Sequence, residues 1–455
     1  MKVHFIAIGG SAMHNLAIAL HKKGYIVTGS DDEIFEPSKS RLNKYGLLPA
    51  KEGWDINNIT NNLDAVILGM HARIDNPELI KAQELGLKIY SYPEYLYEQS
   101  KDKKRVVIGG SHGKTTITSM IMHVLLYNNI DFDYMVGANI EGFETMVKLT
   151  KEAKVTILEG DEYLTSPIDR RPKFHLYNPD IAVISGIAWD HINVFPTFEN
   201  YIEQFEIFIN KITENGCLIY CKEDENVSKI SENSKRNIKK IPYKIHENII
   251  KDNKTYLINK DELIAIDVFG DHNLQNISAT INVCLELGLS LDKIYDAIKT
   301  FKGASKRLQL LDKNEKVIIF QDFAHSPSKL KATIDAVKKQ FNSKNVTACM
   351  ELHTFSSLNK EFLKEYKGAM DNADEPIVYY NPHTIKHKKL EDINIELVKE
   401  SFANSNLKIY TESKELQDYL LSKKYNNDVL LLMSSGNYDG IDLISFAKTI
   451  IEKNN

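Results

Sequence analysis

The stretch that most constrains this chain is RVVIGGSHGKTT, from Arg105 to Thr116. It opens with three β-branched apolar residues, 106–108, which are typical of a buried strand. A turn with three glycines follows, and residues 117–127, ITSMIMHVLLY, continue as an apolar helix. A strand, a glycine turn and a helix in this order predict an α/β unit with the turn at the carboxyl end of the strand.

The turn has the composition of a loop that binds nucleotide phosphates. Glycines let the backbone wrap an anion, and the N–H groups of the turn and helix start point towards it. Lys114 suits the β- and γ-phosphates, and the Thr115 hydroxyl suits Mg²⁺. The usual spacing requires glycine where this chain has Ile108, so the loop reads G-x-x-G-K-T-T instead. The predicted nucleotide-binding residues of this loop are Gly110, Ser111, His112, Gly113, Lys114, Thr115 and Thr116.

Length, charge and cysteine content exclude several classes of protein. A chain of 455 residues is too long for one core and predicts two to four domains. The net charge of −5 argues against a nucleic-acid binder. We find no signal peptide, and no apolar run approaches the ~18 residues of a membrane span. Four sparse cysteines without metal-ligand spacing indicate a reducing compartment. We expect a cytoplasmic protein that binds neither nucleic acid nor membrane.

A second glycine turn lies near the N-terminus. A predicted strand leads into Gly9 and Gly10, a helix follows, and the next strand ends at Ser30 and Asp31. Asp31 falls where dinucleotide-binding units carry a ribose-binding carboxylate, yet the G-x-G-x-x-G pattern is absent. Two interpretations remain open: a plain βαβ unit, or a cradle for a diphosphate that need not belong to NAD.

A predicted strand over residues 155–159 introduces a group of carboxylates, Glu159, Asp161 and Glu162. Carboxylates at the carboxyl end of a strand beside a phosphate loop suit Mg²⁺, which prefers oxygen ligands. The alternative is a solvated acidic turn. The next strand leads to His191, which alone indicates an ordinary surface or core histidine. Near a second metal or the γ-phosphate, His191 becomes a candidate ligand.

Strands and helices alternate to the end of the chain. Asn273 and Asn276 are three residues apart on a predicted helix, so they share one face and can read a base edge. Asp322 and His325 follow a later strand. The repeated βα pattern predicts an α/β fold with mostly parallel sheets, whose ligands gather at the carboxyl ends of the strands. We predict three domains: a Rossmann-like N-terminal domain over residues 1–101, a central P-loop domain over 102–302 and a Rossmann-like C-terminal domain over 303–455.

Eight stretches in sequence order resemble the Mur ligase family, the ATP-dependent amide ligases that build the peptide of bacterial peptidoglycan. They are HFIAIGGSAM, TGSD, GGSHGKTT, EGDEY, DHINVF, GDHNLQN, GASKRLQ and QDFAHSP. The muramate-binding branch fits best, and the displaced glycine is similar to this family's own version of the loop. The resemblance implies ATP and Mg²⁺ as cofactors and UDP-N-acetylmuramate as a substrate.

The resemblance also implies a reaction and a role for each motif. The muramoyl carboxylate attacks the γ-phosphate to give an acyl phosphate and ADP, and an amine then displaces phosphate. The implied catalytic residues are Lys114, Glu159, His191 and His325, with Thr115, Glu159 and His191 on the metal. The implied nucleotide contacts outside the loop are Asn273, Asn276, Arg307 and Asp322. The implied UDP-sugar contacts are Gly9, Gly10, Ser11, Ala12, Met13, Ser30, Asp31 and His71.

Two amine acceptors are implied. One is a recovered murein peptide of the L-alanyl-γ-D-glutamyl-meso-diaminopimelate type, used in peptidoglycan recycling, and the other is L-alanine, used in de novo synthesis. The stretches MHARIDNPEL, DRRPKFHLYNP and MSSGNYDGID favour the peptide. Arg170, Arg171 and Lys173 are candidates for binding its carboxylates, and a solvated basic loop is the alternative. We expect a monomer or a weak homodimer.

Two other classes of function compete with ligation. An NAD-dependent dehydrogenase would use the first domain, but the missing glycine pattern counts against it. A non-catalytic nucleotide switch is argued against by the acidic strand end and by Asp190-His191.

Overall fold

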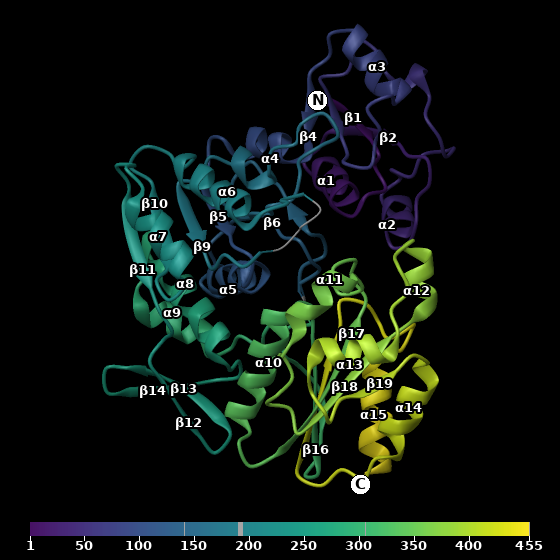
Figure 1. The fold of residues 1–455 in the computed structure, drawn as a ribbon. Helices are drawn as coiled ribbons and strands as arrows, with labels where there is room; N and C mark the ends of the chain where they lie inside the picture. The colour runs from purple at the N-terminus through teal and green to yellow at the C-terminus, as the bar shows by residue number, and fades with distance from the viewer. Residues whose placement is uncertain (141, 190–193, 305, 455) are drawn as a thin grey trace. The chain divides into compact units, whose positions relative to one another are not determined.

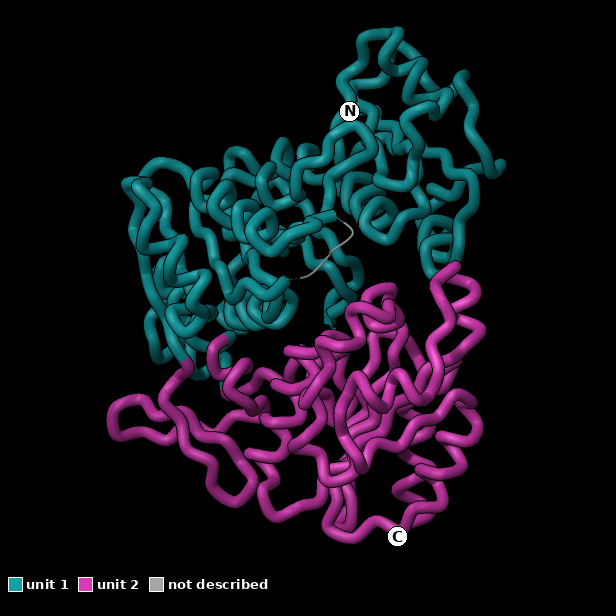
Figure 2. Tube along the Cα trace, viewed as in Figure 1, with its two compact units in different colours: residues 1–244, 276–298 teal, residues 245–275, 299–455 magenta. Residues whose placement is uncertain are grey.

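The structure is a computed structural model that describes residues 1–140, 142–189, 194–304 and 306–454. Helices and strands alternate along most of the chain (Figure 1). The chain divides into two compact units, which Figure 2 shows in teal and magenta. The first unit comprises residues 1–244 and 276–298, and the second comprises residues 245–275 and 299–455.

The first unit begins with a parallel sheet in the order β2-β1-β3-β4. Its strands are β1 (Lys2–Ile6), β2 (Ile26–Ser30), β3 (Ala65–Leu68) and β4 (Ile89–Ser91). Its helices are α1 (Ser11–Lys22), α2 (Ser38–Lys44), α3 (Pro77–Glu84) and α4 (Tyr92–Ser100), with the 3-10 turn η1 (Ile56–Asn58). The apolar run of β3 is buried throughout, as expected of a parallel strand covered on both faces. Because Ile6 pairs with Ser30, the N-terminal glycine turn and the end of β2 lie at the same edge.

The second sheet of this unit has the order β11-β10-β9-β5-β8-β6-β7. Its strands are β5 (Lys104–Gly109), β6 (Asp133–Met135), β7 (Val147–Lys148), β8 (Val155–Glu159), β9 (Ile181–Ile184), β10 (Cys217–Cys221) and β11 (Lys239–Tyr243). The associated helices are α5 (Lys114–Tyr127), α6 (Phe198–Asn210), α7 (Glu225–Asn233), α8 (Asp271–Glu286) and α9 (Leu291–Ile298), with η2 (Lys173–Leu176). Residues 271–275 of α8 belong to the second unit. All pairs are parallel except β6 with β7. Ile108 pairs with Glu159 and Gly109 with Ile184, so the ends of β8 and β9 flank the glycine loop.

The second unit holds a six-stranded sheet in the order β15-β16-β20-β17-β18-β19 and a three-stranded antiparallel sheet, β12-β13-β14. The strands of the six-stranded sheet are β15 (Gln309–Lys313), β16 (Val317–Asp322), β17 (Asn345–Leu352), β18 (Glu375–Tyr380), β19 (Lys408–Tyr410) and β20 (Asp428–Met433). The small sheet contains β12 (Asn248–Lys251), β13 (Lys254–Asn259) and β14 (Glu262–Ile266). The helices are α10 (Pro327–Gln340), α11 (Lys360–Leu363), α12 (Pro382–His387), α13 (Ile395–Phe402), α14 (Ser413–Ser422) and α15 (Leu443–Lys453), with η3 (Lys364–Tyr366). Only the β15–β16 pair of the large sheet is antiparallel.

The predicted α/β fold with mostly parallel sheets is confirmed. The residue boundaries given above for the three domains stay a prediction. All four cysteines are buried and unpaired. Within the described ranges, no helix has both the length and the apolar character that a membrane span requires.

Candidate active site

The phosphate loop joins β5 to α5 in the second sheet. Its backbone needs glycine at two positions, because φ is +127° at Gly110 and +76° at Gly113. A Cβ at Gly110 would overlap Ser185 Oγ. A Cβ at Gly113 would overlap Asn276 Oδ1. Gly113 is the N-cap of α5 and supplies no side chain to its first N–H groups, which therefore suit an anion.

The residues after β9 fix the rest of this loop. Ser111 is buried, and its Oγ accepts a hydrogen bond of 3.0 Å from the Ala188 N–H. Ser185 Oγ donates to the carbonyl of His112. Thr116 is buried in the first turn of α5. The loop is thus a rigid backbone cradle held by the neighbouring strand end.

Lys114 is the first residue of α5, and two oxygen atoms hold its ammonium group. Nζ donates to the Gly110 carbonyl at 2.7 Å and to the Glu162 carboxylate at 2.7 Å. Burial alone would lower the pKa of Lys114, but the negative charges of Glu162 and Asp161 outweigh it and raise the pKa above its usual value. The side chain therefore stays positively charged at neutral pH. A positive charge is what the lysine needs in order to neutralise a phosphate.

Thr115 and Glu159 are brought together, as a shared metal site requires. Thr115 Oγ1 donates to Glu159 Oε1 at 3.0 Å, and the Gly137 N–H donates to Glu159 Oε2 at 3.0 Å. Glu159 is only 8% exposed, and burial raises the pKa of its carboxyl group. These two oxygen donors fit Mg²⁺, which binds one or two protein oxygens together with phosphates and water. His191, the other predicted ligand, lies outside the described residues.

The two predicted adenine-binding asparagines belong to α8 and are both buried. Asn276 packs directly against Gly113 of the phosphate loop. Asn273 Nδ2 donates to the carbonyl of Phe269 at 2.9 Å. Asn276 is therefore part of the wall of the phosphate loop, and the recognition of adenine by either residue stays a prediction.

In the second unit, Asp322 at the end of β16 binds the backbone. Its buried carboxylate accepts hydrogen bonds of 2.7 Å from the N–H groups of Leu308 and Ala324. Both oxygens are used in this way, so Asp322 fixes the turn that carries Arg307. Asp322 therefore acts on the backbone around Arg307, and the predicted contact of Asp322 with the nucleotide stays a prediction.

Arg307 and His325 gather around the same strand end. The Arg307 guanidinium lies over the Phe323 ring, 4.4 Å from its centroid. His325 Nδ1 donates to the Phe323 carbonyl at 2.8 Å. The hydrogen bond at Nδ1 fixes the orientation of the His325 ring beside the end of β16.

The N-terminal glycine turn connects β1 to α1 and is held by Asp31. The Gly9 N–H donates to the Asp31 carboxylate at 2.6 Å, and burial raises the pKa of Asp31 to about 6. Helix α1 begins at Ser11 with Gly10 as its N-cap, which provides no side-chain acceptor. The first N–H groups of α1 are therefore suited to a diphosphate.

The remaining UDP-sugar candidates differ in exposure. Ala12 is exposed on the first turn of α1, whereas Met13 is buried beneath it. Ser30 Oγ donates to the buried carboxylate of Glu78. His71 is exposed in the loop after β3. The cradle itself therefore consists of the glycine turn, the start of α1 and Asp31.

The three basic acceptor candidates lie in the loop after β8. Lys173 forms an ion pair with Asp161, and Arg171 forms one with Asp169 through Nε at 3.0 Å and Nη2 at 2.6 Å. Arg170 is exposed, and no carboxylate of the described residues is within ion-pair distance of it. Two of the three candidates are thus engaged with carboxylates of the loop, whereas Arg170 is exposed and has no such partner among the described residues.

Glu162 and Tyr201 also belong to the site, although the sequence marked Glu162 only as one of three carboxylates suited to Mg²⁺ and gave Tyr201 no role. Glu162 Oε1 accepts a hydrogen bond of 3.0 Å from Tyr201 Oη, which lies 2.9 Å from Ser111 Oγ. The EGDEY stretch marks Glu162 as one carboxylate among three. Nothing in the sequence of α6 distinguishes Tyr201 from an ordinary core aromatic residue.

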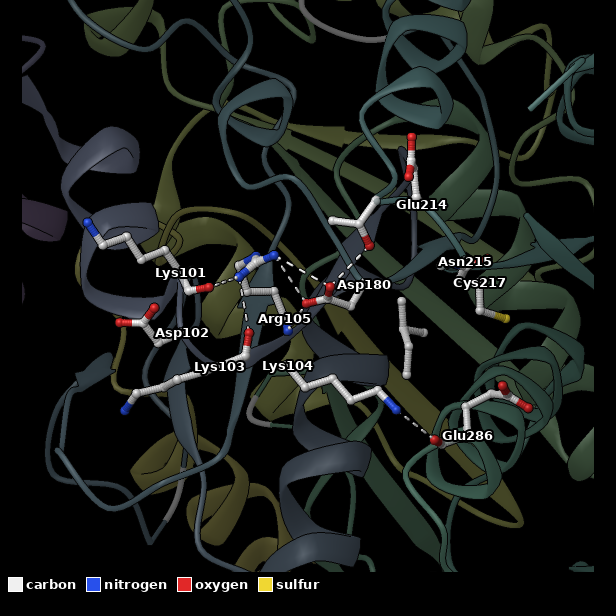
Figure 3. Close-up of a pocket in the computed structure, with 13 residues that line it drawn as sticks. Lys101, Asp102, Lys103, Lys104, Arg105, Asp180, Glu214, Asn215, Cys217 and Glu286 are labelled. Carbon is white, nitrogen blue, oxygen red and sulfur yellow. Dashed lines mark hydrogen bonds and ion pairs between the residues drawn. The ribbon is translucent and has the colours of Figure 1, made fainter. Parts of the chain in front are cut away.

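A separate polar pocket of about 480 Å³ lies at the amino end of β5 (Figure 3). Several of its charged side chains are already engaged: Arg105 pairs with Asp180 at 3.2 Å, and Lys104 Nζ donates to the Glu286 carbonyl at 3.1 Å. Because the phosphate loop follows the opposite end of β5, this pocket is not part of the candidate active site.

Comparisons with known proteins decide the family. The models of the Mur ligase family catalytic domain, the Mur ligase middle domain and the Mur ligase glutamate ligase domain match residues 2–104, 108–284 and 306–436. The UDP-N-acetylmuramate–L-alanine ligase of Sulfurihydrogenibium sp. (strain YO3AOP1) is 30% identical to this chain, covering 99% of it and 98% of the relative. The chain belongs to the Mur ligase family.

Solved structures of Mur ligases share the fold. The UDP-N-acetylmuramate-alanine ligase of Thermotoga maritima has a TM-score of 0.70 at 20% identity, with 100% of this chain and 99% of that chain covered. The murein peptide ligase of Psychrobacter arcticus 273-4 has a TM-score of 0.64 at 21% identity, with 99% and 98% covered.

Family membership confirms the class of enzyme. Mur ligases are ATP- and Mg²⁺-dependent ligases that form amide bonds in peptidoglycan biosynthesis. The predicted ligase activity and the predicted use of ATP and Mg²⁺ are therefore confirmed. The relatives differ in the acceptors that their names state, so the acceptor is a separate question.

Proposed function

We propose that this Mur ligase joins a recovered murein peptide of the L-alanyl-γ-D-glutamyl-meso-diaminopimelate type to the carboxylate of UDP-N-acetylmuramate, in peptidoglycan recycling. The observation that carries the choice of acceptor is the anchored basic loop after β8, which presents Arg170. A peptide with several carboxylates offers partners to such a cation, and free L-alanine offers only one carboxylate.

The chemistry of the proposal uses the phosphate loop. Lys114 contributes a fixed positive charge, and the backbone N–H groups of the loop and of α5 bind phosphate oxygens. Bound at Thr115 and Glu159, Mg²⁺ would neutralise the negative charge of the phosphates. The muramoyl carboxylate attacks the γ-phosphate and ADP leaves, which gives an acyl phosphate. The amine of the acceptor then displaces phosphate from the acyl carbon to form the amide.

The N-terminal turn is our proposed site for the UDP-sugar. Gly9 and Gly10 form the turn, and the buried Asp31 holds its conformation through the Gly9 N–H. The uncapped start of α1 suits the diphosphate of a UDP-sugar as well as it suits that of NAD. The relatives favour a UDP-sugar over NAD as the ligand, because their names include UDP-N-acetylmuramate.

The loop that presents Arg170 is held by its own backbone. Leu164 bridges to Pro172, and the Thr165 N–H donates to the Arg171 carbonyl at 3.0 Å. Arg171 also lies 3.7 Å from Glu94 on α4. A loop fixed in this way can present one guanidinium group at small entropic expense, which favours a specific contact over a solvated basic turn.

L-Alanine is the second candidate acceptor. Several relatives with about 30% identity over nearly the whole chain are named UDP-N-acetylmuramate–L-alanine ligases, including that of Clostridium kluyveri. This likeness is in sequence and extends over all three family models. Acceptor choice depends on a few side chains, so overall identity of this size leaves both candidates open to direct assay.

A phosphate-release assay separates the two acceptors. ATP, Mg²⁺ and UDP-N-acetylmuramate are supplied with L-alanine, L-Ala-γ-D-Glu or the tripeptide, and wild-type protein is compared with Arg170→Ala. The exposed cation Lys235, which follows α7, provides the control Lys235→Ala. We expect turnover with the tripeptide, a KM for it about tenfold higher in Arg170→Ala, and no change in the control. Efficient turnover with L-alanine and none with the tripeptide would overturn the peptide assignment and establish the second candidate.

A further inference from the structure

A continuous chain of hydrogen bonds connects the end of β9 to the ammonium group of Lys114. The Ala188 N–H donates to Ser111 Oγ at 3.0 Å, and Ser111 Oγ lies 2.9 Å from Tyr201 Oη. Tyr201 Oη lies 3.0 Å from Glu162 Oε1, and Glu162 Oε2 accepts from Lys114 Nζ at 2.7 Å. The side chains in this chain are buried: Ser111 is 4% exposed, Tyr201 0% and Glu162 1%. They therefore form hydrogen bonds with protein groups and not with solvent.

The chemistry of the groups fixes the direction of every link. The Glu162 carboxylate beside a charged lysine can only accept, so the Tyr201 hydroxyl donates to it. A tyrosine hydroxyl has one hydrogen, so Ser111 Oγ must be the donor to Tyr201 Oη. Ser111 Oγ in turn accepts from the Ala188 N–H. All four links are satisfied by one arrangement of hydrogens, which makes the chain a well-defined structural element.

We infer that Tyr201 and Glu162 are positioning residues that hold Lys114 in the geometry in which it meets the phosphates of ATP. The inference rests on the proposed role of Lys114. It gives a role to Tyr201, which no sequence motif marks, and it assigns Glu162 to the lysine and not to Mg²⁺. Neither residue needs to touch the nucleotide, because each acts through the lysine.

The geometry at Lys114 supports this role. An ammonium group has three hydrogens, and two of them have acceptors at 2.7 Å, the Gly110 carbonyl and the Glu162 carboxylate. Two fixed acceptors restrict the long, flexible lysine side chain to one orientation. Because two hydrogens of the ammonium group then have fixed positions, the direction of the third is fixed as well. The entropy of the side chain is therefore lost during folding and not when ATP binds.

The surroundings of Tyr201 explain how α6 can fix a distant charge. Its ring lies between Phe195 and Phe205, each with its ring centroid 5.3 Å from that of Tyr201. Because the ring is locked in the core, Oη has one position, and Glu162 Oε1 is held there. Tyr201 thus connects the rigid core to the ammonium group of Lys114 through the carboxylate of Glu162.

The test compares two tyrosines of the same core. Tyr201→Phe removes the linking hydroxyl, and Tyr177→Phe is the matched control, because Tyr177 is fully buried and its hydroxyl has no hydrogen-bond partner among the described residues. The readouts are the affinity of the full-length protein for a non-hydrolysable ATP analogue with Mg²⁺, kcat for phosphate release and thermal stability. We expect Tyr201→Phe to weaken analogue binding about three- to tenfold, as the loss of one hydrogen bond implies. Tyr177→Phe should bind the analogue like the wild type.

Glu162→Gln is the second variant, because glutamine keeps the shape of the side chain and removes the charge that holds the lysine. It should weaken analogue binding at least as much as Tyr201→Phe. If both variants bind the analogue like Tyr177→Phe and only their stability is reduced, the residues are merely structural and the inference is wrong.

Lys114→Ala separates this inference from the proposed role of Lys114. In the Lys114→Ala background, Tyr201→Phe should have no further effect on analogue affinity, because the residue through which it acts is gone. Fully additive effects would overturn the inference while leaving Lys114 in its role. Wild-type affinity and turnover of Lys114→Ala would instead refute the role of Lys114, and the positioning inference with it.

Discussion

Adding one methyl group at Gly113 tests whether the phosphate loop has the conformation described here. Gly113 has φ of +76°, and its Cβ would overlap Asn276 Oδ1. For alanine, the left-handed conformation costs about 1–2 kcal/mol. Moving the Asn276 side chain out of its preferred rotamer adds about 0.5–1.5 kcal/mol. Gly113→Ala should therefore lose about 1.5–3.5 kcal/mol in total.

This loss can appear in either of two quantities. If the loop keeps its conformation, the free energy of unfolding falls by that amount. If the loop relaxes, the affinity for ATP falls about 10- to 400-fold instead, at 1.36 kcal/mol for each factor of ten. Urea denaturation and calorimetric titration with a non-hydrolysable ATP analogue and Mg²⁺ measure the two quantities, and their losses should sum to the stated total.

Gly24→Ala is the matched control, because Gly24 has φ of +91° with no atom within 4 Å of the added Cβ. It should lose stability through the backbone alone and bind the analogue normally. If Gly113→Ala has wild-type stability together with wild-type affinity, the left-handed turn at Gly113 and its contact with Asn276 are wrong.

Three further predictions concern other buried or charged groups. Asp322→Ala leaves the buried N–H groups of Leu308 and Ala324 without their acceptor, and should lower the free energy of unfolding by about 2–5 kcal/mol in urea titrations; Asp322→Asn, which keeps one oxygen, should lose about half as much, and a loss below about 1 kcal/mol for alanine would contradict the positioning role. Burial raises the pKa of Asp31 to about 6 from its usual 3.8, so the folded state favours the protonated acid, and stability is lost as the pH rises through this interval. The stability of the wild type relative to Asp31→Asn should therefore decrease between pH 4 and pH 6, and a constant difference over this range would show that Asp31 has no raised pKa. Glu144 pairs with two lysines in solvent, so Glu144→Gln should leave the thermal midpoint nearly unchanged, at low and at high salt alike; a large loss of stability would show that this exposed cluster holds the first unit together.

Much of the fold follows from local sequence patterns. Short runs of β-branched residues, each followed by a turn and an apolar helix, specify parallel strands because both faces of such strands are covered. The phosphate loop is equally local: Gly110 and Gly113 adopt backbone conformations that other residues disfavour, and Lys114 and Thr115 follow at fixed spacing. Residues that act through backbone shape and sequence spacing were therefore predictable.

Residues that act through tertiary contacts were not predictable in the same way. Lys173 and Arg171 resemble ligands for carboxylates in the sequence, but their partners are Asp161 and Asp169 of the protein itself. Tyr201 has no motif around it, because its role depends on the packing of α6 beside the phosphate loop. Partners of this kind become known only when the strand order and register are known.

The origin of the oxygen in the released phosphate tests the central claim most directly. UDP-N-acetylmuramate labelled with ¹⁸O in its carboxylate is turned over with ATP, Mg²⁺ and the tripeptide, and the inorganic phosphate is analysed by mass spectrometry. If the carboxylate attacks the γ-phosphate at the loop around Lys114, each phosphate released carries one ¹⁸O atom. Phosphate that is free of label while amide product accumulates would contradict activation of the carboxylate by ATP.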